Sequence, residues 1–370
     1  MVDISIVTSG HDVSDARIHR ICAALLDEGL RVEVWGLGSK DSGPPDVVTR
    51  TTRRPGIGAR ALVAIRLAMR ARGRVLLALD PDSFLAAFVI SRIRRTAVVA
   101  DVHEDYAALL GDRAWAVGWR GRLGQRLARL ATAVTRRADL VVVADEHVPP
   151  REARSRIVLR NLPLLELLPA PTAVSRPFRA VYVGDVRGSR GLWTMLDAIE
   201  RTDGWELDVV GPVSPVDAAR LQERLGQGTL ARRVRFHGRH EPRQSWALVA
   251  GAACGLVLLD DTRAFRDALP TKLYEYVASG LPVVVTDLPR QRAFVERYGI
   301  GEVIPSGPEA APATARVLLD WAAHPERLAE LAARTAVFRA EADAWAEDYR
   351  SMARSVARLA AARGADSDTQ

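Results

Sequence analysis

The stretch from Leu258 to Pro289 constrains the fold of this chain more than any other part of its sequence. Its residue pattern predicts a strand end, a polar loop, a helix over Thr271–Ser279 that stops at Gly280, and a second strand over Leu281–Thr286. A strand, loop, helix and strand in this order form a βαβ unit of a parallel sheet. In such sheets ligands bind at the carboxyl ends of the strands, where helix N-termini point N–H groups at anions.

Lys272 lies in the first turn of that predicted helix. Of the 52 Lys and Arg residues in the chain, only Lys40 and Lys272 are lysine. An ammonium is a compact charge for a phosphate group, and the start of a helix adds a positive dipole end. The turn at Pro270–Lys272 is therefore predicted to bind a pyrophosphate. The alternative is that Lys272 is an ordinary solvated side chain.

Asp267 and Glu275 enclose seven residues, and the run Pro-x-Lys-x-x-Glu falls within this frame. The segment resembles the Glu-x7-Glu region of retaining glycosyltransferases of the GT-B fold, family 4. The resemblance is carried by Asp267, Pro270, Lys272, Glu275, Tyr276, Gly280, Pro282, Val283 and Val284. It implies that Glu275 holds the ribose of a nucleotide, that Asp267 faces the donor sugar as a catalytic-site residue, and that Leu269 adjoins the donor. Asp267 departs from the family, where Glu or Asn is usual.

Strand and helix patterns alternate through both halves of the sequence and predict two doubly wound parallel sheets of the α/β class. In the first half the predicted elements are Ile4–Thr8, Asp15–Glu28, Arg31–Trp35, Arg74–Leu79, Pro81–Arg92, Ala97–Val102, Trp119–Arg137 and Leu140–Ala144. In the second half they are Ala180–Val183, Leu192–Glu200, Leu207–Val210, Val216–Leu225 and Val234–Phe236. The turn after the first strand lacks the G-x-G-x-x-G pattern of dinucleotide binders, which disfavours a nicotinamide dehydrogenase.

The resemblance implies two Rossmann-like domains that face a central cleft. We expect an N-terminal acceptor domain over residues 1–165, completed by a terminal helix at about 340–362, and a donor domain over 179–340. A linker is expected at 166–178, within the segment Arg160–Phe178 that contains four prolines. The tail 363–370 is expected to be disordered.

Polar loops that follow the predicted strands supply the other candidate site residues. On the acceptor side these are Gly10, His11, Asp12, Arg17 and Glu104. The Asp101–Tyr106 segment resembles the family loop whose histidine approaches the donor sugar, which makes His103 the catalytic candidate. The alternative for both histidines is that neighbouring backbone groups satisfy them.

In the donor domain, the loop GDVRGSRG lets backbone come close to an anion before a helix. The resemblance implies that Arg190 contacts the diphosphate and that Gly184, Gly211 and Arg239 adjoin the nucleotide. Asp185 stands where the family has a basic residue. Arg187 or Lys272 is the candidate to supply the missing charge.

The charge of the chain is unevenly distributed. Its net excess of seven positive charges lies within residues 1–170, and neither Arg50–Arg74 nor Arg113–Arg137 contains an acidic residue. Apolar residues recur between these arginines, which suits an anionic membrane surface: Leu62, Val63, Leu67, Trp115, Trp119, Leu123 and Leu127. The alternative is that these side chains are core stripes backed by solvated arginines. Nucleic acid is disfavoured because aromatic residues do not alternate with the basic runs.

Cys22 and Cys254 form no C-x-x-C pair, so the sequence supports neither a disulfide framework nor a zinc site. The N-terminus lacks a signal-peptide pattern, and no segment is apolar enough to span a bilayer. We expect a cytoplasmic protein, peripheral on the inner face of the membrane if the basic segments contact lipid.

Together these observations predict a glycosyltransferase that moves a sugar from a nucleoside-diphosphate sugar to an acceptor hydroxyl, in cell-envelope polysaccharide or glycolipid synthesis. The resemblance implies retention of anomeric configuration. No cofactor or metal is expected, because positive charge and helix ends can stabilise the leaving diphosphate. Two alternatives remain: a sugar-nucleotide epimerase of the same fold, and a non-catalytic membrane-associated scaffold.

Overall fold

The computed structural model describes residues 2–56, 59–106, 119–163, 165, 168–226, 230–240 and 242–368. The chain divides into two compact units. The N-terminal unit contains residues 1–161 and 343–370, and the C-terminal unit contains residues 162–342. Trp115, one of the apolar residues considered for a membrane surface, lies outside the described residues.

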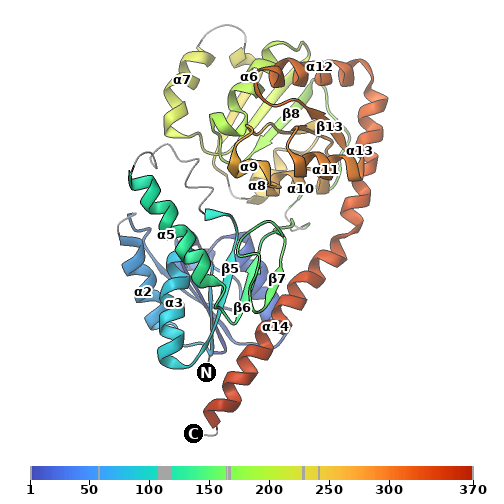
Figure 1. The fold of residues 1–370 in the computed structure, drawn as a ribbon. Coiled ribbons are helices and arrows are strands. Elements are labelled where there is room, and N and C mark those ends of the chain that lie inside the picture. Colours follow the sequence, from blue (N-terminus) through green and yellow to red (C-terminus); the bar gives the residue numbers. More distant parts are fainter. Residues whose placement is uncertain are drawn as a thin grey trace. The chain divides into compact units, whose positions relative to one another are not determined.

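The N-terminal unit is built on a seven-stranded parallel sheet in the order β3-β2-β1-β4-β5-β6-β7 (Figure 1). Its strands are β1 (Ile4–Asp12), β2 (Val32–Leu37), β3 (Val48–Thr52), β4 (Val75–Ala78), β5 (Ala97–Val102), β6 (Leu140–Val143) and β7 (Arg156–Val158). Its helices are α1 (Ala16–Asp27), α2 (Arg60–Arg70), α3 (Pro81–Arg94), α5 (Trp119–Thr135) and α14 (Ala342–Asp368), with a short 3-10 helix over Lys40–Ser42.

Helices cover both faces of this sheet. Ile18 of α1 and Met352 of α14 share one apolar cluster with Ile4 and Leu77 of the sheet. Alternate sheet residues point to the opposite face, where they pack against α2 and α3. The alternation of buried residues along each strand therefore produces three layers from one sheet.

Helix α14 continues through Asp368, into the segment 363–370 for which disorder was predicted. Alanine and arginine are strong helix formers, and no proline interrupts the segment. Once the helix is fixed on the sheet, each further residue adds a hydrogen bond without a new nucleation cost.

The C-terminal unit contains a six-stranded parallel sheet in the order β10-β9-β8-β11-β12-β13 (Figure 1). Its strands are β8 (Phe178–Val183), β9 (Trp205–Val210), β10 (Val234–Gly238), β11 (Cys254–Val257), β12 (Val283–Thr286) and β13 (Gly301–Ile304). Its α-helices are α6 (Leu192–Glu200), α7 (Pro215–Leu225), α8 (Pro242–Ala247), α9 (Arg263–Arg266), α10 (Thr271–Ala278), α11 (Pro289–Tyr298), α12 (Ala310–Ala323) and α13 (Pro325–Ala340). Short 3-10 helices cover Gly188–Arg190, Leu230–Arg232 and Gly307–Glu309.

Candidate functional site

The carboxyl ends of three adjacent strands of the C-terminal unit meet at Gly184 and Gly211. The N–H of Gly184 donates to Val210 at 2.8 Å, and the N–H of Gly211 donates to Gly238 at 2.7 Å. Both glycines have positive φ, and a Cβ on Gly211 would lie 2.0 Å from the carbonyl oxygen of Gly184. Only glycine permits this approach, so the loops after β8, β9 and β10 are held together at one edge of the sheet.

Helix α10 begins beside this edge. Pro270 precedes its first turn, and no side chain caps its N-terminus. The hydroxyl of Tyr276 accepts a hydrogen bond from the N–H of Val183 at 2.7 Å, which fixes α10 against the end of β8. The helix thus presents an N-terminus of the kind that binds anions.

The side chain of Lys272 is buried between α10 and the loop after β8, with only 8% of its surface exposed. Its Nζ lies 3.5 Å from the centre of the Tyr182 ring, and a Cβ on Gly184 would lie 3.0 Å from Nζ. Within the described part of the chain, Nζ has no hydrogen-bond partner. Burial, followed by the positive charge of Arg190, lowers the pKa of Lys272 well below its ordinary value.

Other charged groups surround Lys272. Asp185 and Glu275 act electrostatically on its amine in the opposite sense to Arg190. Arg187 donates to Asp185 at 2.7 Å, so its guanidinium is engaged by the acid that replaces the family's basic residue. Burial raises the pKa of Tyr182 to about 12, which keeps its phenol protonated beside Arg190. The structure therefore brings Lys272, Arg190 and Glu275 together at the carboxyl end of β8.

The remaining donor-side candidates lie on the connections around this group. Asp267 ends α9, is exposed, and accepts a hydrogen bond from Arg290 through its backbone carbonyl at 3.2 Å. Leu269 is partly buried just before Pro270, and Arg239 is exposed just after β10. Tyr182 is the residue of this group that sequence reasoning missed. In the sequence, a tyrosine within a buried strand has no feature that distinguishes it from an ordinary core residue.

In the N-terminal unit, a buried network joins α1 to the end of β5. Both guanidinium nitrogens Nε and Nη2 of Arg17 donate to the carboxylate of Asp101, at 2.8 and 2.6 Å, and Nη1 donates to the carbonyl of Leu159. His103 Nε2 lies 2.8 Å from the same carboxylate. Burial alone would raise the pKa of Asp101, but Arg17 and His103 outweigh it and hold that pKa well below the usual range.

The prediction that Arg17 faces an acceptor is wrong, because only 2% of this residue is exposed. A guanidinium with a carboxylate partner can be buried, and Asp101 provides that partner. Since the Asp101 carboxylate is ionised, Nε2 of His103 donates to it. Nδ1 is then the ring nitrogen of His103 that remains for a ligand hydroxyl.

The ring of His11 stacks on the ring of His103, with centroids 4.9 Å apart and an interplanar angle of 13°. Its Nδ1 is buried and has no hydrogen-bond partner in the described residues. Burial, followed by the neighbouring His103, lowers the pKa of His11. The two histidines predicted from separate loops are therefore brought together, and Nδ1 of His11 faces no partner among the described residues.

The loop around Gly10 is shaped by Asp80. This buried carboxylate accepts hydrogen bonds from the Thr8 hydroxyl at 2.8 Å, from the N–H of Ser9 at 2.9 Å and from the N–H of Gly10 at 3.2 Å. Asp12 instead accepts from Ser14. Asp12 is partly exposed, and Glu104, which follows His103, is exposed.

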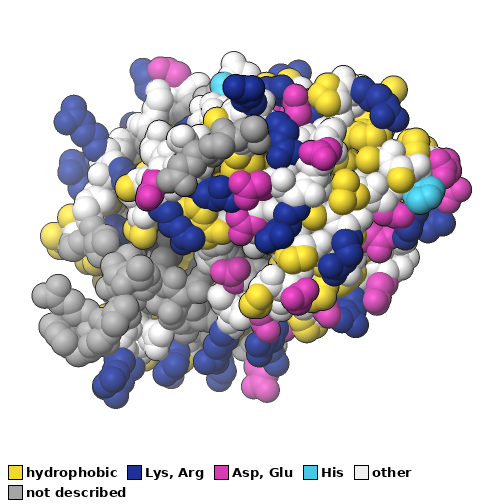
Figure 2. Space-filling model, turned by 90° about the horizontal axis from the view of Figure 1, so that it is seen from above, with side chains coloured by type: hydrophobic (Ala, Val, Ile, Leu, Met, Phe, Trp, Pro, Cys, Tyr) yellow, Lys and Arg dark blue, Asp and Glu magenta, His cyan; other side chains and the backbone are white. Residues whose placement is uncertain are grey.

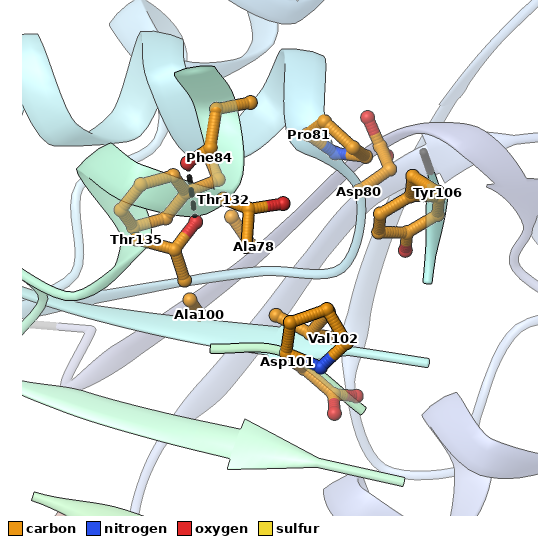
Figure 3. Close-up of a pocket in the computed structure, with 12 residues that line it drawn as sticks. Ala78, Asp80, Pro81, Phe84, Ala100, Asp101, Val102, Tyr106, Thr132 and Thr135 are labelled. Carbon is orange, nitrogen blue, oxygen red and sulfur yellow. Dashed lines mark hydrogen bonds between the residues drawn. The ribbon is translucent and has the colours of Figure 1, made fainter. Parts of the chain in front are cut away.

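A pocket lies at the ends of β4 and β5, below α3 and α5 (Figure 3). Its lining is mainly apolar and includes Phe84, Ala100 and Val102. The hydroxyl of Thr135 is occupied, since it donates to Ala131 at 2.8 Å. The carboxylates of Asp80 and Asp101 in the lining are engaged as well.

Residues 168–335 match the family described as Glycosyl transferases group 1. No curated protein matches the sequence. In the described part of the chain no group of three or more His, Cys, Asp or Glu residues is arranged to hold a metal ion. No helix among the described residues has the length and apolar character needed to cross a membrane.

Solved structures resemble the chain over nearly its full length. Sucrose-phosphate synthase from Thermosynechococcus elongatus has a TM-score of 0.77 at 16% identity, covering 98% of this chain and 100% of that one. Anabaena HepE in complex with UDP-glucose has a TM-score of 0.65 at 14% identity, with 100% of both chains covered. Trehalose 6-phosphate synthase from Burkholderia multivorans has a TM-score of 0.62 at 14% identity, covering 100% of this chain and 98% of that one. With the two parallel sheets, this likeness shows that the chain has the GT-B fold.

Proposed function

We propose that the protein is a retaining glycosyltransferase of family 4 that transfers a sugar from a nucleoside-diphosphate sugar to an acceptor hydroxyl. The observation that carries the proposal is the buried amine of Lys272, which lacks a hydrogen-bond partner among the described residues at the open N-terminus of α10. A buried donor without an acceptor costs free energy, and a diphosphate oxygen is the acceptor that would relieve this cost. The match of residues 168–335 to group 1 glycosyl transferases supports the same assignment.

Each donor-side residue receives a role. Lys272, Arg190 and the N-terminus of α10 bind the diphosphate and stabilise the charge that develops on it as the glycosidic bond breaks. Glu275 accepts hydrogen bonds from the ribose hydroxyls, and Asp267 contacts the donor sugar. Gly184 and Gly211 allow the backbone to approach the nucleotide, and Arg239 lies near the base.

Retention follows if the acceptor attacks from the face that the diphosphate leaves. The leaving phosphate oxygen then takes the acceptor proton, so no carboxylate base is needed. His103, held through Nε2 by Asp101, is assigned to the donor sugar, where its Nδ1 accepts a hydroxyl hydrogen bond. The acceptor side is assigned to His11, Gly10, Asp12 and Glu104. The proposed product is a cell-envelope polysaccharide or glycolipid that is made at the cytoplasmic face of the membrane. Lys272 and Arg190 supply the leaving-group charge stabilisation that a metal ion supplies elsewhere.

Calorimetric titration with UDP, GDP, ADP and dTDP tests this function. One diphosphate should bind, and Lys272→Ala should weaken its binding at least tenfold, because a charge-assisted hydrogen bond contributes about 1.5–3 kcal/mol. Lys40→Ala is the matched control, since Lys40 is the only other lysine and is exposed. Equal affinity of both variants would remove Lys272 from the site.

Glu275→Ala separates the nucleotide from the sugar. Its binding loss should be the same for the free diphosphate and for the sugar nucleotide, since the ribose is common to both. A loss of affinity that appears only with the nucleotide of one particular sugar would contradict the assignment of Glu275 to the ribose. Incubation of the preferred sugar nucleotide without acceptor distinguishes transfer from epimerisation, because an epimerase converts its substrate without a second hydroxyl compound.

A further inference from the structure

Three neighbouring helices of the N-terminal unit expose large apolar side chains. Of the fourteen such side chains exposed in the described part of the chain, nine lie on α2, α3 and α5. They are Leu62, Ile65 and Met69 on α2, Leu85, Val89 and Ile93 on α3, and Leu123, Leu127 and Leu130 on α5. We call these nine residues the apolar stripe set. Single exposed apolar residues are ordinary, but nine on adjacent helices require an explanation.

These residues are not needed for the core, because each helix buries a different side. Leu67 of α2 and Phe84 and Ile90 of α3 pack on the sheet. Leu67 was one of the residues predicted to face a membrane, and that prediction is wrong because only 4% of it is exposed. Within each helix the exposed residues recur at spacings of three or four, so each set forms one outward row.

The three rows lie on one face of the sheet, where α2, α3 and α5 run beside one another (Figure 1). Arginines of α3 join the helices at their ends. Arg94 donates to the carbonyl of Ala71, which follows α2, at 2.7 Å. Arg92 donates to the carbonyl of Arg137, which follows α5, at 3.1 Å. The apolar stripe set therefore belongs to one connected surface.

Positive charge is interspersed with the apolar rows. Exposed arginines on and just after these helices are Arg66, Arg70, Arg92, Arg94, Arg95, Arg122, Arg126, Arg129, Arg136 and Arg137. The only acidic residue on the three helices is Asp82, which Arg60 pairs at 3.2 Å. By contrast, Figure 2 shows acidic and basic side chains intermixed over much of the face it presents.

We propose that the outer face of α2, α3 and α5 binds a membrane surface that contains anionic phospholipids. Leucine, isoleucine and methionine side chains would insert at the boundary of the headgroups and acyl chains, while the arginines contact lipid phosphates. A second copy of this chain fits less well, because it would bring the same arginines against each other. Nucleic acid fits less well, because large aliphatic side chains have no favourable partner on a phosphate backbone. The surface is independent of the proposed glycosyl transfer and does not include any donor-site residue.

Co-sedimentation of the full chain with vesicles of phosphatidylcholine, with or without phosphatidylglycerol, tests the proposal. The protein should sediment only with vesicles that contain phosphatidylglycerol, and less as the salt concentration rises. The triple variant Leu62→Ser, Val89→Ser, Leu127→Ser should lose at least tenfold in partitioning. Val216→Ser with Val337→Ser is its control, since both valines are exposed on other helices, at 81% and 60%.

The double variant Arg66→Glu, Arg126→Glu tests the electrostatic part. Each basic residue near an anionic surface contributes about fivefold in partitioning, so the double variant should lose at least about twentyfold. Arg316→Glu, an exposed change on α12, is its control. Sedimentation that none of the α2, α3 and α5 changes reduces would overturn the proposal. The proposal would also be overturned if the wild type were a dimer that bound neither type of vesicle, and if the triple serine variant were a monomer. Titration of each variant with the preferred diphosphate should give wild-type affinity, which keeps failure of lipid binding separate from failure of the nucleotide site.

Discussion

At the residue scale, the buried amine of Lys272 should lower the stability of the protein without ligand and raise its affinity for a diphosphate. Lys272→Met keeps a chain of similar length and removes a buried donor, so the free energy of unfolding of the C-terminal unit without nucleotide should rise by about 1–3 kcal/mol. The pKa of Lys272 in the folded state lies below the unfolded value of 10.5, so at a pH between these two values the unfolded state binds more protons than the folded state. The wild type therefore becomes more stable as the pH rises toward 10.5, and the difference in unfolding free energy between Lys272→Met and the wild type should narrow.

Thermal unfolding over a pH series measures this effect, with Lys40→Met as the matched change at an exposed lysine. A lower midpoint for Lys272→Met at neutral pH would show that the amine already has a compensating partner. The same variant should gain less stability than the wild type when the preferred diphosphate is added.

Substitution of Asp101 should lower the free energy of unfolding, whereas substitution of Lys272 should raise it. Asp101→Asn leaves the buried Arg17 guanidinium without its ion pair and should cost about 3–5 kcal/mol of unfolding free energy. Since the pKa of Asp101 is lowered by folding, its contribution is complete above the unfolded value of about 3.9 and is lost as the pH falls through the folded value. Urea unfolding measures the cost, and Glu104→Gln provides an exposed acid three positions away as control. Equal stability of the two variants would contradict the assigned network.

At the element scale, α14 should determine the stability of the N-terminal unit although it comes from the other end of the chain. Met352 is fully buried against α1 and the first sheet. Met352→Ala should cost about 2–5 kcal/mol, through lost burial and the cavity left behind. Ser351→Ala, exposed one position earlier, should change stability by less than about 0.5 kcal/mol. Circular-dichroism melts compare the two, and a loss as small as for Ser351→Ala would argue against close packing of α14.

The sequence predicted the elements that combine a clear period with a stop signal. The helix expected over Thr271–Ser279 is α10 at Thr271–Ala278, and the one expected over Trp119–Arg137 is α5 at Trp119–Thr135. The edge strands β3 and β7 were missed, because VTRTT and RIV are short and only partly buried and so lack an apolar run.

The candidate site was predictable in its residue types but not in its burial. The turn chemistry around Pro270 and Lys272 indicated an anion site, since it depends on neighbours in sequence. The stacking of Lys272 on Tyr182 and the pairing of Arg17 with Asp101 join residues about 90 and 84 positions apart. Such contacts arise from tertiary packing, which local patterns do not encode.

At the scale of the whole molecule, the two units have separate apolar clusters. One contains Trp205 and Trp321 of the C-terminal unit, and others contain Met352 or Phe84 of the N-terminal unit. The proposed diphosphate site lies wholly in the C-terminal unit, around Lys272. A nucleotide should therefore stabilise one unit and leave the intrinsic stability of the other unchanged.

Calorimetric unfolding with and without the preferred diphosphate tests this division. At a ligand concentration of a hundred times Kd, the C-terminal unit should gain about 2.7 kcal/mol, which for a unit of its size raises its midpoint by roughly 5–10 °C. Hydrogen exchange should slow in the segments around Gly184 and α10, while the strands β1 to β7 keep their rates. Met352→Ala should lower the transition of the N-terminal unit without changing the ligand-dependent shift. Protection that appears equally in both units would mean that the nucleotide contacts residues of the N-terminal unit directly, and the donor site would then have to be redrawn to include them.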